Sequence, residues 1–336
     1  MRKWLPALGG AAALLSLAAA LWSRPSEIDD QLTARRRVFS AVGPGLREVR
    51  RAANGHYYVL ASPAVGVAIF DAKEKQLAVI GAPAEAPVAN KARSLIAFGE
   101  DCDVDREGNV YVADRGSNLV SVFSPDGRPL RSFPVDAPLS LAALPDGEVA
   151  LTGLEQSHLV TVYAPNGTIA REFGEHESVS SRADLDRLAN LGRVVSDPQG
   201  RLYFGFTYLP EPLVRQYDRF GYARQSFEFT GIDAFPEAQA MRREVERQET
   251  TRKGPPSLRP ILTAFGVDPV SGDVWMGLHN TLVHFDAEGI RRSEYQIYTP
   301  KGARLEASVI LVEAETLLIG SDPLGVYEFA RPDRQH

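Results

Sequence analysis

The sequence predicts an all-β fold: a six-bladed β-propeller of four-stranded antiparallel blades, closed by an N-terminal strand that completes the last blade. Turns of the Asp/Asn-x-Gly or Pro-x-Gly type recur along the chain, separated by apolar stretches of strand length. These turns come in pairs of nearly constant spacing, with glycines at 108 and 127, 147 and 167, 200 and 221, and 272 and 289. Units of constant internal length joined by variable links are typical of propeller blades.

The blades can be placed in chain order. The first is expected over Leu46–Ile80, with Tyr57–Leu60 and Val67–Phe70 as its middle strands, and the next four carry the paired turns. The last blade has only three strands, Ser308–Val312, Thr316–Gly320 and Gly325–Phe329. Because Arg37–Val42 is an unpartnered strand before the first blade, we expect Val38–Val42 to pair beside Gly325–Phe329 and close the ring. Closure would protect edges that an open array exposes.

The N-terminus carries a targeting signal. Arg2 and Lys3 precede an apolar run that ends at Trp22, and small residues at Ala18 and Ala20 suit a cut after Ala20. The alternative is an uncleaved anchor, because the run is nearly long enough to cross a membrane. We therefore expect a periplasmic or secreted protein, or one anchored by this segment. The expected organisation is a signal peptide or anchor over 1–22, a linker over 23–36, the propeller over 37–330 with a helical insert at about 233–250, and a tail over 331–336.

Composition excludes several classes of protein. The net charge is −6, and charges of both signs are interspersed, so the clustered Lys and Arg of a nucleic-acid-binding surface are absent. Cys102 is the only cysteine, which excludes an intramolecular disulfide and any multi-cysteine metal site.

One repeat has a family resemblance. The segment Asp103–Asp114, followed by Asn118–Ser124, closely resembles the NHL repeat found in propellers of the TolB-like superfamily. The resemblance extends more weakly over residues 46 to 330. It implies a six-bladed propeller whose first strands line an axial channel. It implies little about activity, since such propellers serve as binding scaffolds, lyases and hydrolases.

The expected site is a mouth walled by loops. In each blade, the loop between the second and third strands and the link to the next blade open on the same face, so the long links 81–95, 174–192 and 230–260 should surround one concavity. A histidine near carboxylates suits general-base or metal chemistry. The catalytic candidates are therefore His158, His279 and Glu155. The alternative for His158 is that it starts a strand, because it occupies the position that Asn118 holds in its own repeat. The residues expected to bind at the channel mouth are Asp101, Asp103, Arg115, Tyr208 and Asp322.

The sequence favours no metal or cofactor. One inner strand is acidic, at Glu100, Asp101 and Asp103, but its counterparts in four later blades are small or apolar, and no paired histidine spacing occurs. The leading hypothesis is an exported, non-catalytic scaffold that binds a protein or small molecule on the loop-walled face. The alternative is a propeller hydrolase or lyase that uses histidines and carboxylates at the channel mouth.

Overall fold

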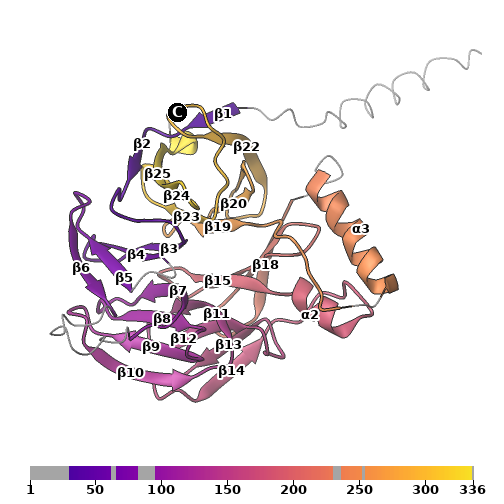
Figure 1. Ribbon diagram of the computed structural model, residues 1–336, viewed down its shortest axis with the longest axis horizontal. Coiled ribbons are helices and arrows are strands. Elements are labelled where there is room, and N and C mark those ends of the chain that lie inside the picture. Colours follow the sequence, from indigo (N-terminus) through magenta and orange to yellow (C-terminus); the bar gives the residue numbers. More distant parts are fainter. Residues whose placement is uncertain (1–29, 62–65, 82–94, 230–235, 252–253, 335–336) are drawn as a thin grey trace, which may run out of the picture.

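The computed structural model is a propeller of six blades around a common axis (Figure 1). It describes residues 30–61, 66–81, 95–229, 236–251 and 254–334. In these segments no helix is both long and apolar enough to span a bilayer. The proposed signal or anchor over 1–22 lies outside the described residues.

Each blade is an antiparallel meander whose first strand is innermost. The first strands of neighbouring blades contact one another, as β3 does β7 and β23. The strands of the six blades are, in order, β3(Leu46–Arg51), β4(Tyr57–Ala61), β5(Val67–Phe70) and β6(Gln76–Ile80); β7(Gly99–Val104), β8(Val110–Asp114), β9(Leu119–Phe123) and β10(Pro129–Pro134); β11(Pro138–Ala143), β12(Val149–Gly153), β13(Val160–Tyr163) and β14(Ile169–Phe173); β15(Gly192–Ser196), β16(Leu202–Phe206), β17(Leu213–Tyr217) and β18(Ala223–Glu228); β19(Ala264–Val267), β20(Val274–Leu278), β21(Thr281–Phe285) and β22(Arg291–Tyr298); and β23(Val309–Val312), β24(Thr316–Ser321) and β25(Gly325–Ala330).

The N-terminal segment adds strands to the last two blades. β2(Arg36–Val38) pairs antiparallel with β25, with Arg37 opposite Tyr327, and so takes the fourth position in the sixth blade. This strand lies earlier than the expected pairing of Val38–Val42, because the chain turns at Phe39, where φ is +49°. The expected linker over 23–36 also contains a strand, since β1(Asp30–Thr33) pairs parallel with β22.

The segment after β2 contributes to a core shared by the last and first blades. Phe39 is 2% exposed, and its ring lies 5.1 Å from that of Tyr57 and 5.0 Å from that of Phe70. The same apolar cluster contains Val309 and Val326 of the sixth blade. Residues 36–42 therefore join the two blades through both hydrogen bonds and apolar packing.

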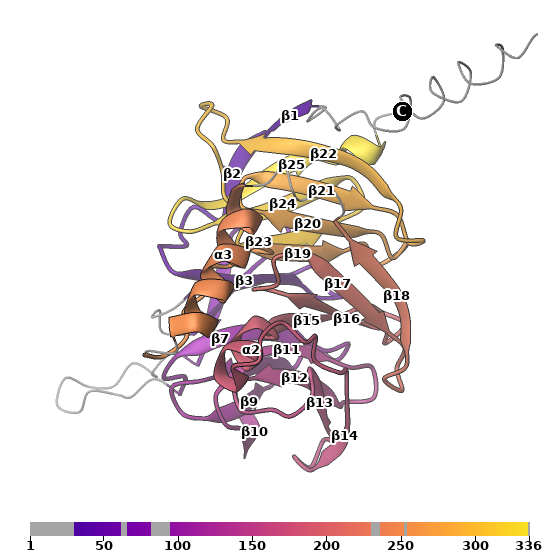
Figure 2. The same ribbon diagram turned by 90° about the vertical axis from the view of Figure 1, so that its right-hand side faces the viewer.

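Two helices occupy the long links. α2(Ala183–Ala189) precedes β15, and α3(Pro236–Thr251) supplies the expected helical insert before β19. Figure 1 shows α3 outside the blades and beside α2, and Figure 2 shows α3 running across the edges of several blades. Leu185 of α2 packs with Met241 and Val245 of α3, and the Glu249 carboxylate accepts the backbone N–H of Ser181 at 2.7 Å. The two links therefore pack on each other.

Truncating Phe39 should destabilise the fold strongly. Phe39→Ala removes a buried ring from the core between the first and last blades, and we expect the free energy of unfolding to fall by about 3–5 kcal/mol. Phe220→Ala is the matched control, because Phe220 is 64% exposed. Chemical denaturation should show that the control changes little. Equal losses in the two variants would mean that the N-terminal segment does not hold these blades together.

Candidate functional site

The propeller has two faces. We call the face with the inter-blade links and the loops between second and third strands the link face, and the opposite face, with the short turns, the turn face. The structure distributes the expected binding residues rather than gathering them at one mouth. Asp101 lies inside the channel, Asp103 lines a cavity on the turn face, and Arg115 and Tyr208 lie on the link face. Asp322 accepts a hydrogen bond from the backbone of Gly45 at 2.7 Å.

On the link face, Glu100 lies among cationic and aromatic side chains. Glu100 pairs with Arg115 at 2.5 Å and with Arg47 at 3.5 Å. Both guanidinium groups lie over the Phe98 ring, 5.1–5.3 Å from its centroid, at a distance typical of cation–π contacts. Burial and the charge of Glu100 raise the pKa of Tyr208. Arg115 therefore pairs with Glu100, and Tyr208 lies close enough to Glu100 for the carboxylate charge to act on its hydroxyl group.

Below this group, charged side chains from opposite sides cross the channel. Arg193 of β15 reaches Glu48 of β3, with 2.6 Å between Nη2 and Oε2, and its Nη2 lies 3.7 Å from Asp101 of β7. Arg50 of β3 lies 3.3–3.9 Å from the carboxylates of Glu48, Asp101 and Asp103. We call these five residues the channel network. It connects the first, second and fourth blades across the axis.

Burial controls the protonation of the channel network. Glu48 is 3% exposed, and this burial raises its pKa to about 7, against the attraction of Arg50 and Arg193. Burial likewise raises the pKa of Asp103, and this effect outweighs the lowering effect of Arg50 and of two backbone N–H groups that donate to the carboxylate. Burial also raises the pKa of Cys102 well above its usual value, so the thiol is no nucleophile.

A wide concavity opens on the turn face. It has a volume of about 700 Å³ and is lined by the ends of all six first strands and the turns that follow them. Arg50 and Asp103 of the channel network belong to its lining. Its apolar lining residues include Val104, Leu144, Pro145, Val195, Pro198, Val267, Ile310 and Val312. We call it the axial cavity. It lies at the end of the channel opposite the long links, so the expected loop-walled mouth is not where this cavity opens.

The catalytic candidates do not form a site. His158 is exposed and contacts Ser157, while Glu155 pairs with Arg187 at 3.3 Å. At His279 the recorded hydrogen bonds involve the backbone, including one donated by Ala307. Within the described part of the chain, neither histidine has a carboxylate at ion-pair distance.

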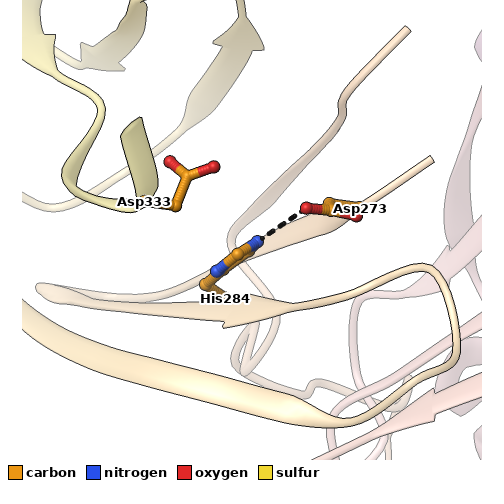
Figure 3. A group of neighbouring side chains, drawn as sticks. All are labelled: Asp273, His284 and Asp333. Atoms are coloured by element: carbon orange, nitrogen blue, oxygen red, sulfur yellow. Dashed lines mark hydrogen bonds and ion pairs between the residues drawn. The ribbon is translucent and has the colours of Figure 1, made fainter. Parts of the chain in front are cut away.

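A different histidine does have carboxylate neighbours. His284 of β21 lies 3.1 Å from Asp273 through its Nε2 atom, and one ligand atom each from His284, Asp273 and Asp333 lie within 4.8 Å of one another (Figure 3). Asp273 precedes β20, and Asp333 belongs to the short helix η2(Pro332–Arg334). We call these three residues the blade-5 cluster. One imidazole nitrogen and two carboxylate oxygens are ligand atoms that transition metals accept.

Sequence reasoning missed Glu48, Arg50, Arg193 and the blade-5 cluster. Glu48 and Arg50 have the spacing of side chains on one face of a strand, the same signal that marked Asp101 and Asp103 on β7. The same spacing in the first blade was therefore sufficient to predict that Glu48 and Arg50 face the channel together. No local pattern links Asp333 to His284.

Comparisons with known proteins identify the fold alone. No protein-family description matches the chain, and no curated protein matches it. Among solved structures it is similar to a catalytically inactive virginiamycin B lyase from Staphylococcus aureus with quinupristin, at 12% identity and a TM-score of 0.54, covering 86% of this chain and 81% of that one. It is also similar to U3-55K, at 10% identity and a TM-score of 0.54, covering 88% and 98%.

A third similar structure is Kuenenia stuttgartiensis hydrazine synthase, at 12% identity and a TM-score of 0.53, covering 86% of this chain and 96% of that one. These structural neighbours are propeller proteins with different activities. They confirm the six-bladed propeller and are consistent with an NHL-like repeat, but they assign no function.

The channel network should make stability depend on pH. The raised pKa of Glu48 means that folding favours its protonated form, so its stabilising contribution is complete below about pH 4.5 and is lost as the pH rises through about 7. The loss should be about 3 kcal/mol, and Asp103 adds to it in the same direction.

Denaturation of Glu48→Gln between pH 5 and 8 should therefore show a smaller fall in unfolding free energy than the unsubstituted protein. Glu155→Gln is the control, because Glu155 is exposed and lies outside the network. An unchanged pH profile in Glu48→Gln would show that Glu48 does not titrate in this range.

Proposed function

We propose that this protein is a non-catalytic binding module whose ligand enters the axial cavity on the turn face. The observation that carries the proposal is the cavity itself, because about 700 Å³ is within the size range of small-molecule sites and all six blades contribute to its walls. The proposal keeps the scaffold role expected from the sequence but moves the binding surface from the link face to the turn face.

The lining favours a ligand with an apolar body and an anionic or hydrogen-bond-accepting group. Most of the deep wall is apolar, which favours burial of apolar ligand surface. Arg50 makes ion pairs at 3.3–3.9 Å, but within the described chain its guanidinium donates no hydrogen bond. Its fork of N–H donors is suited to a carboxylate-like acceptor at the base of the cavity.

Three carboxylates that line the cavity are already engaged. Asp197 accepts hydrogen bonds from the backbone N–H groups of Gln199 and Arg201, and Asp268 accepts one from Arg331 at 2.6 Å. Glu313 pairs with Arg51 at 2.8 Å. These three carboxylates therefore stabilise the turns that shape the rim. Among the charged groups of the lining, Arg50 is the one that also belongs to the channel network, together with Asp103, and we assign it the role of orienting the ligand.

The hydrolase or lyase alternative receives less support. It requires a histidine with carboxylates at the channel mouth, whereas His158 and His279 lack such neighbours in the described structure. Similarity to a lyase at 12% identity concerns the fold and carries no catalytic residue to this chain.

We also propose that the protein is exported, on the basis of Arg2, Lys3 and the apolar run that follows them. N-terminal sequencing of the protein from an expressing cell should show a start at Leu21, after a cut behind Ala20. An intact Met1 in the membrane fraction would instead identify an anchor.

Binding to the cavity can be tested with anilinonaphthalene sulfonate, a fluorescent probe with an apolar body and an anionic group. We expect saturable binding of one probe to the native protein. Arg50→Lys keeps the charge but loses the planar donor fork and should weaken binding about tenfold, equivalent to about 1.4 kcal/mol. Ala53→Trp places a bulky ring at the exposed edge of the cavity and should abolish the saturable component.

Arg115→Lys is the matched control, because Arg115 lies on the link face. It should bind the probe like the unsubstituted protein, and near-ultraviolet circular dichroism should confirm that all variants are folded. Probe binding that is insensitive to Ala53→Trp, or lost equally in Arg115→Lys, would rule out the axial cavity as the binding site.

A further inference from the structure

We propose that the blade-5 cluster, Asp273, His284 and Asp333, binds a divalent transition metal, with Zn²⁺ the best-suited ion. The cluster is separate from the axial cavity, and the proposal does not depend on what enters that cavity. It rests on the donor set, the geometry of the three side chains and the charge balance around them.

The donor set is that of a metal site with an open position. One imidazole nitrogen and two carboxylate oxygens are ligands that Zn²⁺ accepts, and three protein ligands leave a fourth position for water. Acidic side chains on a protein surface are common without a metal, but His284 is only 5% exposed and directs Nε2 towards Asp273 (Figure 3). An imidazole buried between two carboxylates is a more specific arrangement than an acidic patch.

The distances fit a common metal centre. Two ligands bound to the same tetrahedral Zn²⁺ at about 2.0–2.1 Å lie about 3.3 Å apart. Nε2 of His284 and Oδ2 of Asp273 are already 3.1 Å apart. With all three ligand atoms within 4.8 Å of one another, Asp333 needs only a small side-chain movement to complete the site.

The neighbouring groups hold the ligands in place. The His284 ring stacks on Trp275, with centroids 4.2 Å apart and an angle of 12° between the planes, which fixes the imidazole. Arg331 donates to both carboxylate oxygens of Asp333, at 2.6 and 3.1 Å. Because each carboxylate oxygen has two lone pairs, Asp333 can accept these bonds and still bind a metal, and metal-ligating carboxylates are ordinarily hydrogen-bonded in this way.

The local charges leave room for a cation. Three carboxylates, those of Asp268, Asp273 and Asp333, lie among two guanidinium groups, those of Arg331 and Arg334. With a neutral imidazole, the form that binds metals, this group carries a net charge of one negative unit. Asp268 and Arg331 are each only 1% exposed, so solvent screens the negative charge at this part of the group poorly. A bound divalent cation would compensate it.

The test is titration of the untagged full-length protein with ZnCl₂, followed by calorimetry and by competition with a chromogenic chelator. We expect one Zn²⁺ per chain and a Tm that rises with Zn²⁺ concentration, because a ligand that binds only the folded state stabilises it. His284→Gln and Asp333→Asn should each weaken binding at least about tenfold. Co²⁺ should give visible absorption bands that both variants lose.

His158→Gln is the matched control, because His158 is an exposed histidine on the link face. It should bind Zn²⁺ like the unsubstituted protein. Near-ultraviolet circular dichroism without metal distinguishes lost ligation from lost folding. The proposal is overturned if the unsubstituted protein binds no Zn²⁺ at micromolar concentration, or if folded His284→Gln binds it with unchanged stoichiometry and affinity.

Discussion

The hydrogen bond that Arg193 donates to Glu48 is the constraint on which the centre of the propeller depends. These residues belong to the fourth and first blades, and 2.6 Å separates their charged atoms. Removing Arg193 would leave the buried Glu48 with Arg50, at 3.3 Å, as its remaining cationic partner, and removing one member of a buried ion pair usually costs several kcal/mol. The pair therefore fixes the distance between blades on opposite sides of the axis. The pair lies between the residues around Glu100 on the link face and the axial cavity on the turn face.

The opposite wall of the channel is built by close packing. Gly266 of β19 lies against β23 so tightly that a Cβ atom there would come within 2.5 Å of the Ile310 carbonyl oxygen. Any larger side chain would push the fifth and sixth blades apart. The channel is thus polar where the first, second and fourth blades meet and close-packed between the fifth and sixth. The lining of the cavity is accordingly charged at Arg50 and Asp103 of the first and second blades and apolar at Ile310 and Val312 of the sixth.

The sequence was sufficient to predict the blades but not the site. Turn glycines such as Gly108 and Gly127 require positive φ, at 85° and 82°, so the short-range pattern reports directly on each meander. The channel network depends instead on which side chains meet across the axis, and Arg193 and Glu48 are 145 residues apart. The long links were expected to wall a mouth, but apolar residues such as Leu185 and Met241 pack α2 and α3 together. Asp333 lies in the segment that was expected to be a tail, and His284, which lies close to it in space, has the sequence context of an ordinary strand residue. Their proximity could therefore not be predicted from the sequence.

Both ends of the described chain bind to the fifth and sixth blades. At the outer edges, β1 adds to the fifth blade and β2 to the sixth, so a single extended segment holds both. On the turn face, Arg331 is 1% exposed and binds Asp268 of the fifth blade, the Glu313 carbonyl of the sixth and Asp333 of η2. Since Asp268 lines the axial cavity while Asp333 belongs to the blade-5 cluster, one buried guanidinium connects both proposed sites. A change of charge at either site therefore acts on the same residue, and through it on the packing of the two blades.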